Sequence, residues 1–401
     1  MKKRIFILCI LALLLLLPLE VQAIHQEDDP YAGIEEEWKK EIEEGISGQL
    51  EGLDLKSLDD ALDKLDEEGL GGYSARRMIE DVTSGNMPLS TNSLLELLGK
   101  LFLKEVGNSW HMILKVIVMA LLCSLMTVFQ SPNARQGVSD TAYFVCYVLI
   151  IMVLAQSLSA CVAEGIRAID SMAGIMEGVF PILIALLTAL GGVASAGVFQ
   201  PAMAALTGGI VSTIRGIIMP VVLGCGVLVI VSNVSERIQI KRLTELIKSV
   251  CQWLIGIVFT IYIGVVAIQG MSASAIDGIS IRTAKYTIDR ALPIAGKMLA
   301  DTVDTMMGCS LVLKNALGVV TLIVTIALIA APVIHILVNI FLFRMAAALI
   351  EPVGDKRIAD CLFELSDVLV LLLIIVLATG IMMFITIGLA MSAGNANIML
   401  R

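Results

Sequence analysis

The amino-acid sequence predicts an all-α protein: a polytopic bundle of about six to eight transmembrane helices, preceded by an exported helical region at the N-terminus. Hydrophobic residues make up 57% of the 401 residues, charged residues make up 16%, and the mean hydropathy is +0.89. This composition is typical of multi-pass membrane proteins and excludes an ordinary soluble enzyme. Only 5% of residues are aromatic and 33 are glycine, a mixture expected of closely packed membrane helices and not of a membrane β-barrel.

The first 23 residues have the pattern of a secretory signal peptide. Basic residues at positions 2–4 precede the apolar run 5–17, and small residues suited to signal peptidase follow up to Ala23. We therefore expect residues 1–23 to be cleaved and residues 24–109 to begin outside the cytoplasm. An uncleaved anchor helix is the alternative, although the apolar run is short for a span of about 20 residues.

The exported segment 24–109 is acidic, with 21 Asp and Glu against 8 Lys and Arg. Leucines repeat at helical spacing from Leu50 to Leu65, and a second apolar stripe from Leu94 to Phe102 follows a turn pattern at residues 85–88. These patterns predict short amphipathic helices and then a helix that leads into the membrane. The acidic region is either a docking surface for a partner or a solvated spacer that keeps the exported end soluble.

Five hydrophobic stretches are long enough to span a bilayer, and a further apolar block is harder to divide. This block, residues 172–232, is interrupted by prolines and glycine pairs and predicts broken helices, either two kinked spans or three short ones. Together with the first three stretches it makes up an expected membrane bundle of residues 110–271. The five stretches are residues 110–130, 141–163, 250–271, 317–343 and 366–392.

Charge placement favours an odd number of crossings in the block. Cytoplasmic loops carry an excess of Lys and Arg, and both the segment 233–249 and the pair Lys356 and Arg357 are basic. If the chain returns outside near Glu164, three short spans, or one span plus a re-entrant pair, place 233–249 in the cytoplasm. Two full spans with this basic loop outside are the alternative.

Residues 272–316 are too polar to cross a membrane and are expected to form an amphipathic connection. Apolar residues from Ile288 to Met306 fall three and four positions apart, which predicts one helix lying on the membrane or against a partner. Membrane helices then resume in residues 317–401.

Two ionisable residues inside the apolar block, Glu177 and Arg215, are the candidate pore or packing residues. Charges in hydrocarbon are costly and often mark pathways. The two side chains could pair across neighbouring helices. Alternatively, each lies at a membrane interface and extends its charge toward water.

The sequence carries no motif for a metal, a cofactor or catalysis. Its three histidines are scattered, and it has neither a phosphate-binding loop nor a dinucleotide fingerprint. We therefore expect no cofactor, no metal and no enzymatic activity, and the net charge of −9 gives no reason to expect nucleic acid. Apart from Cys9, the cysteines lie in or beside hydrophobic segments, which indicates packing residues and not a disulfide framework.

Four stretches resemble the stage III sporulation protein AE family. The resemblance implies a multi-pass protein that is made in the mother cell of endospore-forming bacteria and placed in the membrane around the forespore. It supplies no catalytic residue. The stretches are residues 94–105, 178–192, 289–316 and 350–355, the last followed by Leu365 and Ser366.

The resemblance also implies a function and partners. The chain is expected to be a subunit, either scaffold or conduit, of a channel or secretion-like complex that links mother cell and forespore and is required for forespore development. The expected partners are the other proteins of the same operon, including a secretion-ATPase-like subunit and ring-forming subunits, a forespore membrane protein, and the lipid bilayer. A stand-alone secondary transporter of small solutes is the alternative, motivated by the broken helices.

Overall fold

The structure, a computed structural model, describes residues 45–67, 74–85, 91–128, 136–234, 240–291, 296–352 and 355–393, and these residues are helical or lie in short turns. The predicted signal peptide lies outside the described residues. The helices are α3 (Lys56–Glu67), α4 (Ala75–Thr83), α5 (Thr91–Val128), α6 (Gln136–Ala189), α7 (Val193–Thr213), the π-helical turn η1 (Ile214–Ile218), α8 (Met219–Val234), α9 (Lys241–Ala291), α10 (Gly296–Ile350) and α11 (Lys356–Ser392).

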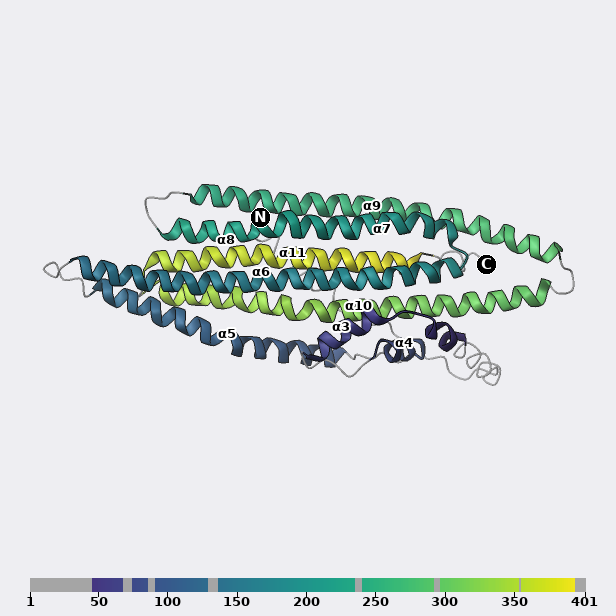
Figure 1. The fold of residues 1–401 in the computed structure, drawn as a ribbon, viewed down its shortest axis with the longest axis horizontal. Coiled ribbons are helices and arrows are strands. Elements are labelled where there is room, and N and C mark those ends of the chain that lie inside the picture. The colour runs from purple at the N-terminus through teal and green to yellow at the C-terminus, as the bar shows by residue number, and fades with distance from the viewer. Residues whose placement is uncertain are drawn as a thin grey trace.

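Six long helical segments lie side by side along one axis, and successive segments run in alternate directions (Figure 1). Each contains a stretch long and apolar enough to cross a membrane. The segments are α5, α6, the continuous helix formed by α7, η1 and α8, then α9, α10 and α11. The prediction of an all-α, polytopic membrane protein is therefore confirmed.

Several of these helices are much longer than a bilayer is thick. Helix α6 has 54 residues and α10 has 55, so at 1.5 Å per residue each is about 80 Å long. The hydrocarbon core of a bilayer measures about 30 Å. A large part of the bundle must therefore project beyond the membrane.

Residues 172–232 do not contain the odd number of crossings that charge placement favoured, and two helical pieces, the number in the alternative of two kinked spans, divide the block. Helix α6 runs without interruption from the predicted second span, past Glu164, to Ala189, so the chain does not turn back near Glu164. The block therefore holds the end of α6 and one further helical segment, and it contains neither a re-entrant pair nor three short spans.

The single turn in this block is set by glycine. Gly191 has φ +81°, a left-handed conformation that glycine adopts without steric cost. The amide of Gly192 donates to the carbonyl of Leu187, and the amide of Gly191 donates to that of Thr188. This is the hydrogen-bond pattern of a glycine-terminated helix end, which explains why α6 stops here.

The prolines of the block lie inside helices. Pro181 is in α6, Pro201 is in α7, and Pro220 is the second residue of α8. Proline removes one backbone hydrogen bond, but long membrane helices tolerate this loss when neighbouring helices hold the segment in place. The prolines therefore predicted more helix ends in this block than the structure contains.

The amphipathic connection was also wrong in its details. Residues 288–306 do not form one helix, because α9 ends at Ala291 and α10 begins at Gly296. The polar residues of segment 272–316 belong to the far ends of these two long, antiparallel helices (Figure 1). The spacing of three and four was correct for each helix, but it could not show that the chain reverses between them.

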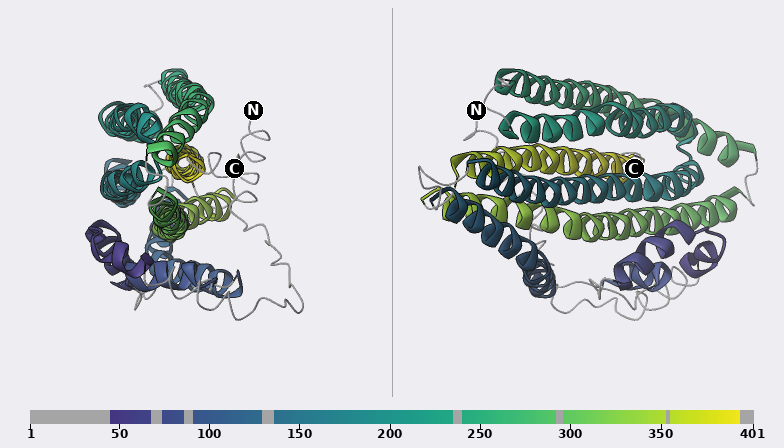
Figure 2. Two further views of the ribbon diagram at one scale, coloured as in Figure 1. Left: turned by 90° about the vertical axis from the view of Figure 1, so that its right-hand side faces the viewer. Right: turned by 60° about the vertical axis from the view of Figure 1, so that its left-hand side comes forward.

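The N-terminal helix α3 packs against α6 and α10, and α4 packs against α10 (Figure 2). The leucines that predicted helices in this region are buried there, including Leu58, Leu62 and Leu65. Ser57 lies so close to the backbone of Gly178 that a Cβ at position 178 would be 1.9 Å from its Oγ. The shared apolar cluster includes Ile46, Leu50, Leu58, Ala61, Met78 and Ile79 with Ile175, Val179, Leu183, Leu313, Leu317 and Val320.

The core between the long helices is mostly apolar, but it also buries the side chains of Lys314 and Asn339 in α10. One cluster of buried residues draws on α5, α6, α8, α9, α10 and α11. Buried threonines satisfy their hydroxyl groups within their own helices: Thr321, Thr325, Thr379 and Thr386 each donate to the carbonyl four residues earlier. Their polar groups therefore do not require water in the core.

Candidate functional site

Helices α5, α8 and α9, together with η1, expose many bulky apolar side chains on the outside of the bundle. Lipid covers such surfaces in membrane proteins. We call this set the apolar belt. It comprises Trp110, Leu114, Val118, Leu121 and Leu122 of α5, Ile217, Leu223, Val227 and Val231 of η1 and α8, and Leu243, Leu246, Val250, Trp253, Ile257 and Ile261 of α9.

The outward face of α6 changes from apolar to polar at Gln156. Before this residue, α6 exposes large apolar side chains such as Leu149 and Met152. Beyond it, the side chains on the same face are polar or small, and several are exposed to solvent. We call the polar members the α6 polar stripe: Gln156, Ser159, Glu164, Arg167, Asp170 and Glu177, separated by the small residues Ala160, Ala163 and Gly174.

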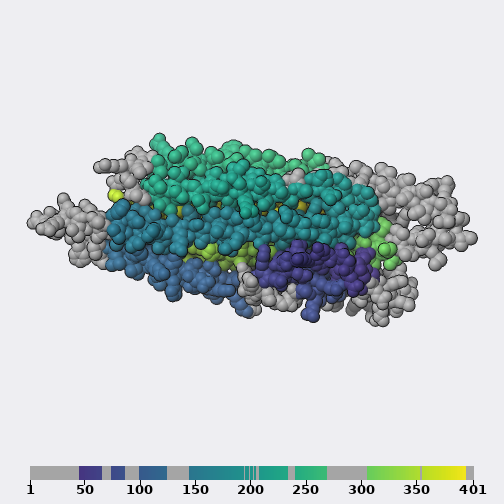
Figure 3. Space-filling view, viewed as in Figure 1, coloured from purple at the N-terminus to yellow at the C-terminus, as the bar shows by residue number. Residues whose placement is uncertain are grey.

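Much of this stripe lies level with the apolar belt. Leu158 of α6 contacts the backbone of Gly226 in α8, where an added Cβ would be 2.1 Å from its Cδ2. Neighbouring residues of α8, Leu223 and Val227, are exposed belt residues. Figure 3 shows α6 lying open across the middle of one face of the molecule. The stripe therefore places polar groups on the outside of the bundle where the next helix is still apolar.

Two ion pairs lie in the part of the stripe between Glu164 and Asp170. Arg167 pairs with Glu164 on the same helix. Arg215 reaches across from η1, and its Nη1 lies 3.3 Å from Oδ1 of Asp170, with 63% and 38% of the two side chains exposed. Single π-helical turns inside α-helices are rare and occur often at functional sites. The position of Arg215 in η1 is therefore a second reason to include it in the candidate site.

Of the two alternatives for Glu177 and Arg215, the structure does not show a pair between them. Arg215 pairs instead with Asp170, and Glu177 lies exposed two turns further along α6. The sequence reasoning missed Asp170 because it precedes residue 172, where the apolar block was taken to begin. A search for carboxylates seven residues before Glu177 on a continuous helix would have found it, because that spacing returns to the same helix face.

A second polar edge follows the outside of α5. Lys104, Asn108, His111 and Lys115 are exposed at spacings of three and four residues. Beside this edge, Glu105 lies 3.5 Å from Nε2 of His335 and joins α5 to α10. Polar groups thus occupy part of the outer surface of α5 as well.

A polar cluster near the end of α8 and the start of α9 joins three helices. The carboxylate of Glu364 in α11 lies 3.1 Å from Nζ of Lys241 and accepts a hydrogen bond of 3.0 Å from Asn233. Lys248 donates to the backbone carbonyl of Glu364 over 3.3 Å. This cluster satisfies its charges internally, and we interpret it as a clamp between α8, α9 and α11.

The described part of the chain contains no group of three or more His, Cys, Asp or Glu side chains placed to hold a metal ion. The seven cysteines of this part form no disulfide with one another, and six of them are buried. The hydroxyl groups of Thr188, Thr207 and Thr213 donate to carbonyls of their own helices. The candidate site is therefore the α6 polar stripe together with Arg215.

Comparison with known proteins gives one consistent answer. The model of a protein family described as "Stage III sporulation protein AE" matches residues 73–394. The chain is also similar to stage III sporulation protein AE of Bacillus subtilis (strain 168), with 28% identity over 333 residues that cover 83% of this chain and 84% of that protein. No solved structure matches the chain.

Proposed function

Because the chain belongs to the stage III sporulation protein AE family, we propose that it is a subunit of a channel or secretion-like complex that links mother cell and forespore. The chain is a multi-pass membrane protein involved in stage III sporulation. Its proposed place is the mother-cell-derived membrane around the forespore, and its proposed role is to sustain forespore development.

The observation that carries this proposal is the α6 polar stripe at the level of the apolar belt. A pure scaffold embedded in lipid has no need of polar side chains on its outer surface, and placing them in hydrocarbon is unfavourable. Polar side chains at that level are favourable where they face water. The stripe therefore supports a conduit more strongly than a scaffold.

The proposed partners are the other proteins of the same operon, including a secretion-ATPase-like subunit and ring-forming subunits, together with a forespore membrane protein. The long helices support this arrangement, because α6 and α10 are far longer than the bilayer is thick. Their projecting ends, with α3 and α4 docked on them, offer a rigid surface in the space between the two membranes.

Replacement of a stripe residue tests this function in the spore-forming host. Arg215→Ala or Glu177→Ala, introduced at the native locus, should reduce the number of heat-resistant spores and late gene expression in the forespore. Ile261→Ala on the exposed face of α9 is the matched control and should form spores normally. The amount of each variant in the membrane is measured alongside, and normal sporulation of both stripe variants would contradict a lining role.

No observation favours the stand-alone transporter. That alternative was motivated by broken helices, and within the described residues the block 172–232 turns only near Gly191. Uptake of small solutes by the purified chain in liposomes, without any partner, would support the transporter alternative.

A further inference from the structure

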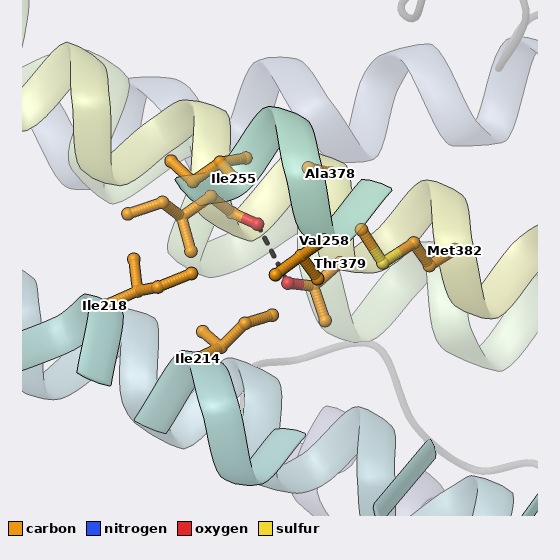
Figure 4. A pocket seen from close by; sticks show the side chains of 8 residues that line it. Ile214, Ile218, Ile255, Val258, Ala378, Thr379 and Met382 are labelled. Atoms are coloured by element: carbon orange, nitrogen blue, oxygen red, sulfur yellow. Dashed lines mark hydrogen bonds between the residues drawn. The ribbon is translucent and has the colours of Figure 1, made fainter. Parts of the chain in front are cut away.

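A small cavity between η1, α9 and α11 offers no chemistry for a ligand. Its volume is about 10 Å³, close to the smallest space that can hold one water molecule. Figure 4 shows its lining, in which the hydroxyl of Thr379 is turned to the carbonyl of Ile375. The other lining residues, such as Ile214 and Ile218, are apolar.

Helix α10, by contrast, buries several polar side chains, among them Ser310, Lys314 and Asn339. Nζ of Lys314 donates to the backbone carbonyl of Ala393 at the end of α11. Nδ2 of Asn339 donates to the carbonyl of His335 over 2.9 Å. Both buried groups therefore have an acceptor, as buried polar groups normally do.

The imidazole of His335 is different, because it is satisfied on one side only. Its Nδ1 is buried and has no hydrogen-bond partner among the described residues. Its Nε2 lies 3.5 Å from Oε1 of Glu105 in α5, with 24% and 25% of the two side chains exposed. Oγ of Ser109 donates to the same carboxylate oxygen over 3.4 Å. Both helices contain a candidate membrane span at these positions, and ionisable groups in such spans often take part in proton transfer.

The carboxylate of Glu105 is the charged group that contacts His335. On α6, the charges of Glu105 and Glu164 both reach the buried thiol of Cys161, but Glu164 is already paired with Arg167. Helices α3 and α4 pack on α10 nearer its start, in the cluster that contains Leu313.

The other charges around the pair are turned away or absent. On α5, Lys104 and His111 lie on the exposed outer edge. Along α10 the next charged residue is Arg344, which pairs with Asp367 of α11. Helix α11 has no charged residue after Asp367, and α9 has none in residues 249–276.

We propose that Glu105, Ser109 and His335 form a proton-binding site between α5 and α10, and that binding of a proton changes the contact between the two helices. A neutral ring that donates from Nε2 to Glu105 leaves only a lone pair on Nδ1. A protonated ring carries a hydrogen on both nitrogens. A buried N–H without an acceptor is unfavourable, so the ring must move or admit water when it gains a proton. This inference does not rest on the proposed channel function.

The two helices are built so that a change at this pair can be transmitted. Pro332 lies one turn before His335 inside α10 and removes one backbone hydrogen bond there. On α5, Leu103 is 72% exposed whereas Ile113 is fully buried. Glu105 therefore lies where α5 begins to pack against the bundle, and a change at Glu105 alters where α5 leaves α10.

The protonation of the ring is measured in the full chain, purified into lipid nanodiscs and carrying isotope-labelled histidine. The chain has only three histidines, so His335→Gln and His111→Gln assign the signals in a nuclear magnetic resonance spectrum. Imidazole is the side chain that ordinarily changes its charge between about pH 5 and pH 8. We expect the ring of His335 to gain a proton within this range.

The contact is measured with a pair of spin labels at Leu103→Cys in α5 and Leu337→Cys in α10, two exposed positions. The chain without these cysteines is the blank, because its described cysteines are buried or half-buried. We expect the distance between the labels to shift over the pH range in which the ring gains its proton. His335→Gln and Glu105→Gln should each abolish the shift, because neither variant can form the imidazolium–carboxylate pair. His111→Gln is the matched control and should keep it.

Three results would overturn the proposal. A ring of His335 that keeps one protonation state across the range means that the site binds no proton. A ring that gains a proton at constant label distance means that the proton does not change the contact. A shift that persists in both site variants, or that disappears in His111→Gln, means that another group carries it. Two site variants are included so that poor folding of one does not decide the result, and the sporulation of Arg215→Ala and Glu177→Ala tests the channel function separately.

Discussion

Helices α6 and α9 both lie on the surface of the bundle, and each contains a span of nearly the same mean hydropathy, yet they use their apolar residues differently. In the 18-residue apolar stretch of α6, 39% of the residues are buried, whereas only 11% are buried in the corresponding stretch of α9. Helix α6 turns its apolar side chains inward and its polar ones outward beyond Gln156. Helix α9 turns Trp253, Ile257 and Ile261 outward.

The contrast shows that hydropathy identifies a membrane helix but not the medium on its outer face. Helix α9 has the surface expected of a lipid-facing helix, because its bulkiest apolar side chains point outward. Helix α6 is built like a helix of a soluble protein over part of its length, with apolar residues inside and polar residues outside. Water or protein, and not lipid, is the surrounding that suits this part of α6.

The largest expected effect comes from a glycine that α6 uses for packing. Gly178→Val should displace α3, because an added Cβ would be 1.9 Å from Oγ and 2.3 Å from Cβ of Ser57. Overpacking of this kind costs about 1–3 kcal/mol, occasionally more. Limited proteolysis of the full chain in membranes should then cut the segment 45–85 much faster than in the unsubstituted protein.

The matched control is a glycine of α9. At Gly256 an added Cβ has no atom within 4 Å, so Gly256→Val should leave the proteolysis pattern unchanged. Equal sensitivity of the two variants would show that α6 and α9 are not packed as differently as the structure indicates.

The second largest effect is expected from substitutions that make the outer face of α6 resemble that of α9. The double variant Gln156→Leu and Ser159→Leu should insert normally and accumulate, because leucine is a strong helix former and favourable in lipid. It should nevertheless lose most heat-resistant spores, because the stripe no longer attracts water. The control Ile257→Leu alters the α9 face without changing its character and should sporulate normally. Full sporulation of the double variant would show that function does not require the polar side chains of Gln156 and Ser159.

The sequence predicted the all-α class and most spans because long apolar runs are a direct consequence of the thickness of the bilayer. It misjudged the block 172–232 because Pro181 and Gly191 both disfavour helix, and only Gly191 takes a left-handed conformation that ends one. Arg215, which the sequence suggested as a candidate charge in the apolar block, lies in η1 and pairs with Asp170. Its partner could not be identified, because pairing depends on how α6 and η1 align, and local spacing does not encode that alignment.

A smaller effect is expected where α9 is attached to the bundle. The hydroxyl of Tyr262 is buried and bonds to the carbonyl of Met382 and, over 2.8 Å, to the hydroxyl of Thr386. Tyr262→Phe should cost about 0.5–1.5 kcal/mol, the usual net value of a hydrogen bond. The temperature at which the chain aggregates in isolated membranes should fall slightly, whereas Thr260→Val on the exposed side of α9 should leave it unchanged. An unchanged temperature for Tyr262→Phe would show that α9 depends on apolar packing alone.

The smallest effect on stability is expected from the pair of Arg215 and Asp170, and its size distinguishes water from lipid. An ion pair exposed to water contributes about 0.2–1 kcal/mol, so Asp170→Asn should change the aggregation temperature in membranes very little. If the stripe faced lipid as α9 does, an arginine left without its partner would cost about 2.5–3.5 kcal/mol, and the variant would accumulate poorly. Exchanging the two residues, Arg215→Asp with Asp170→Arg, keeps the pair and should restore sporulation that either single change impairs. Rescue by the exchange would show that the pair itself is needed. Failure of the exchange, with normal accumulation, would mean that function depends on arginine at the position set by the π-helical turn.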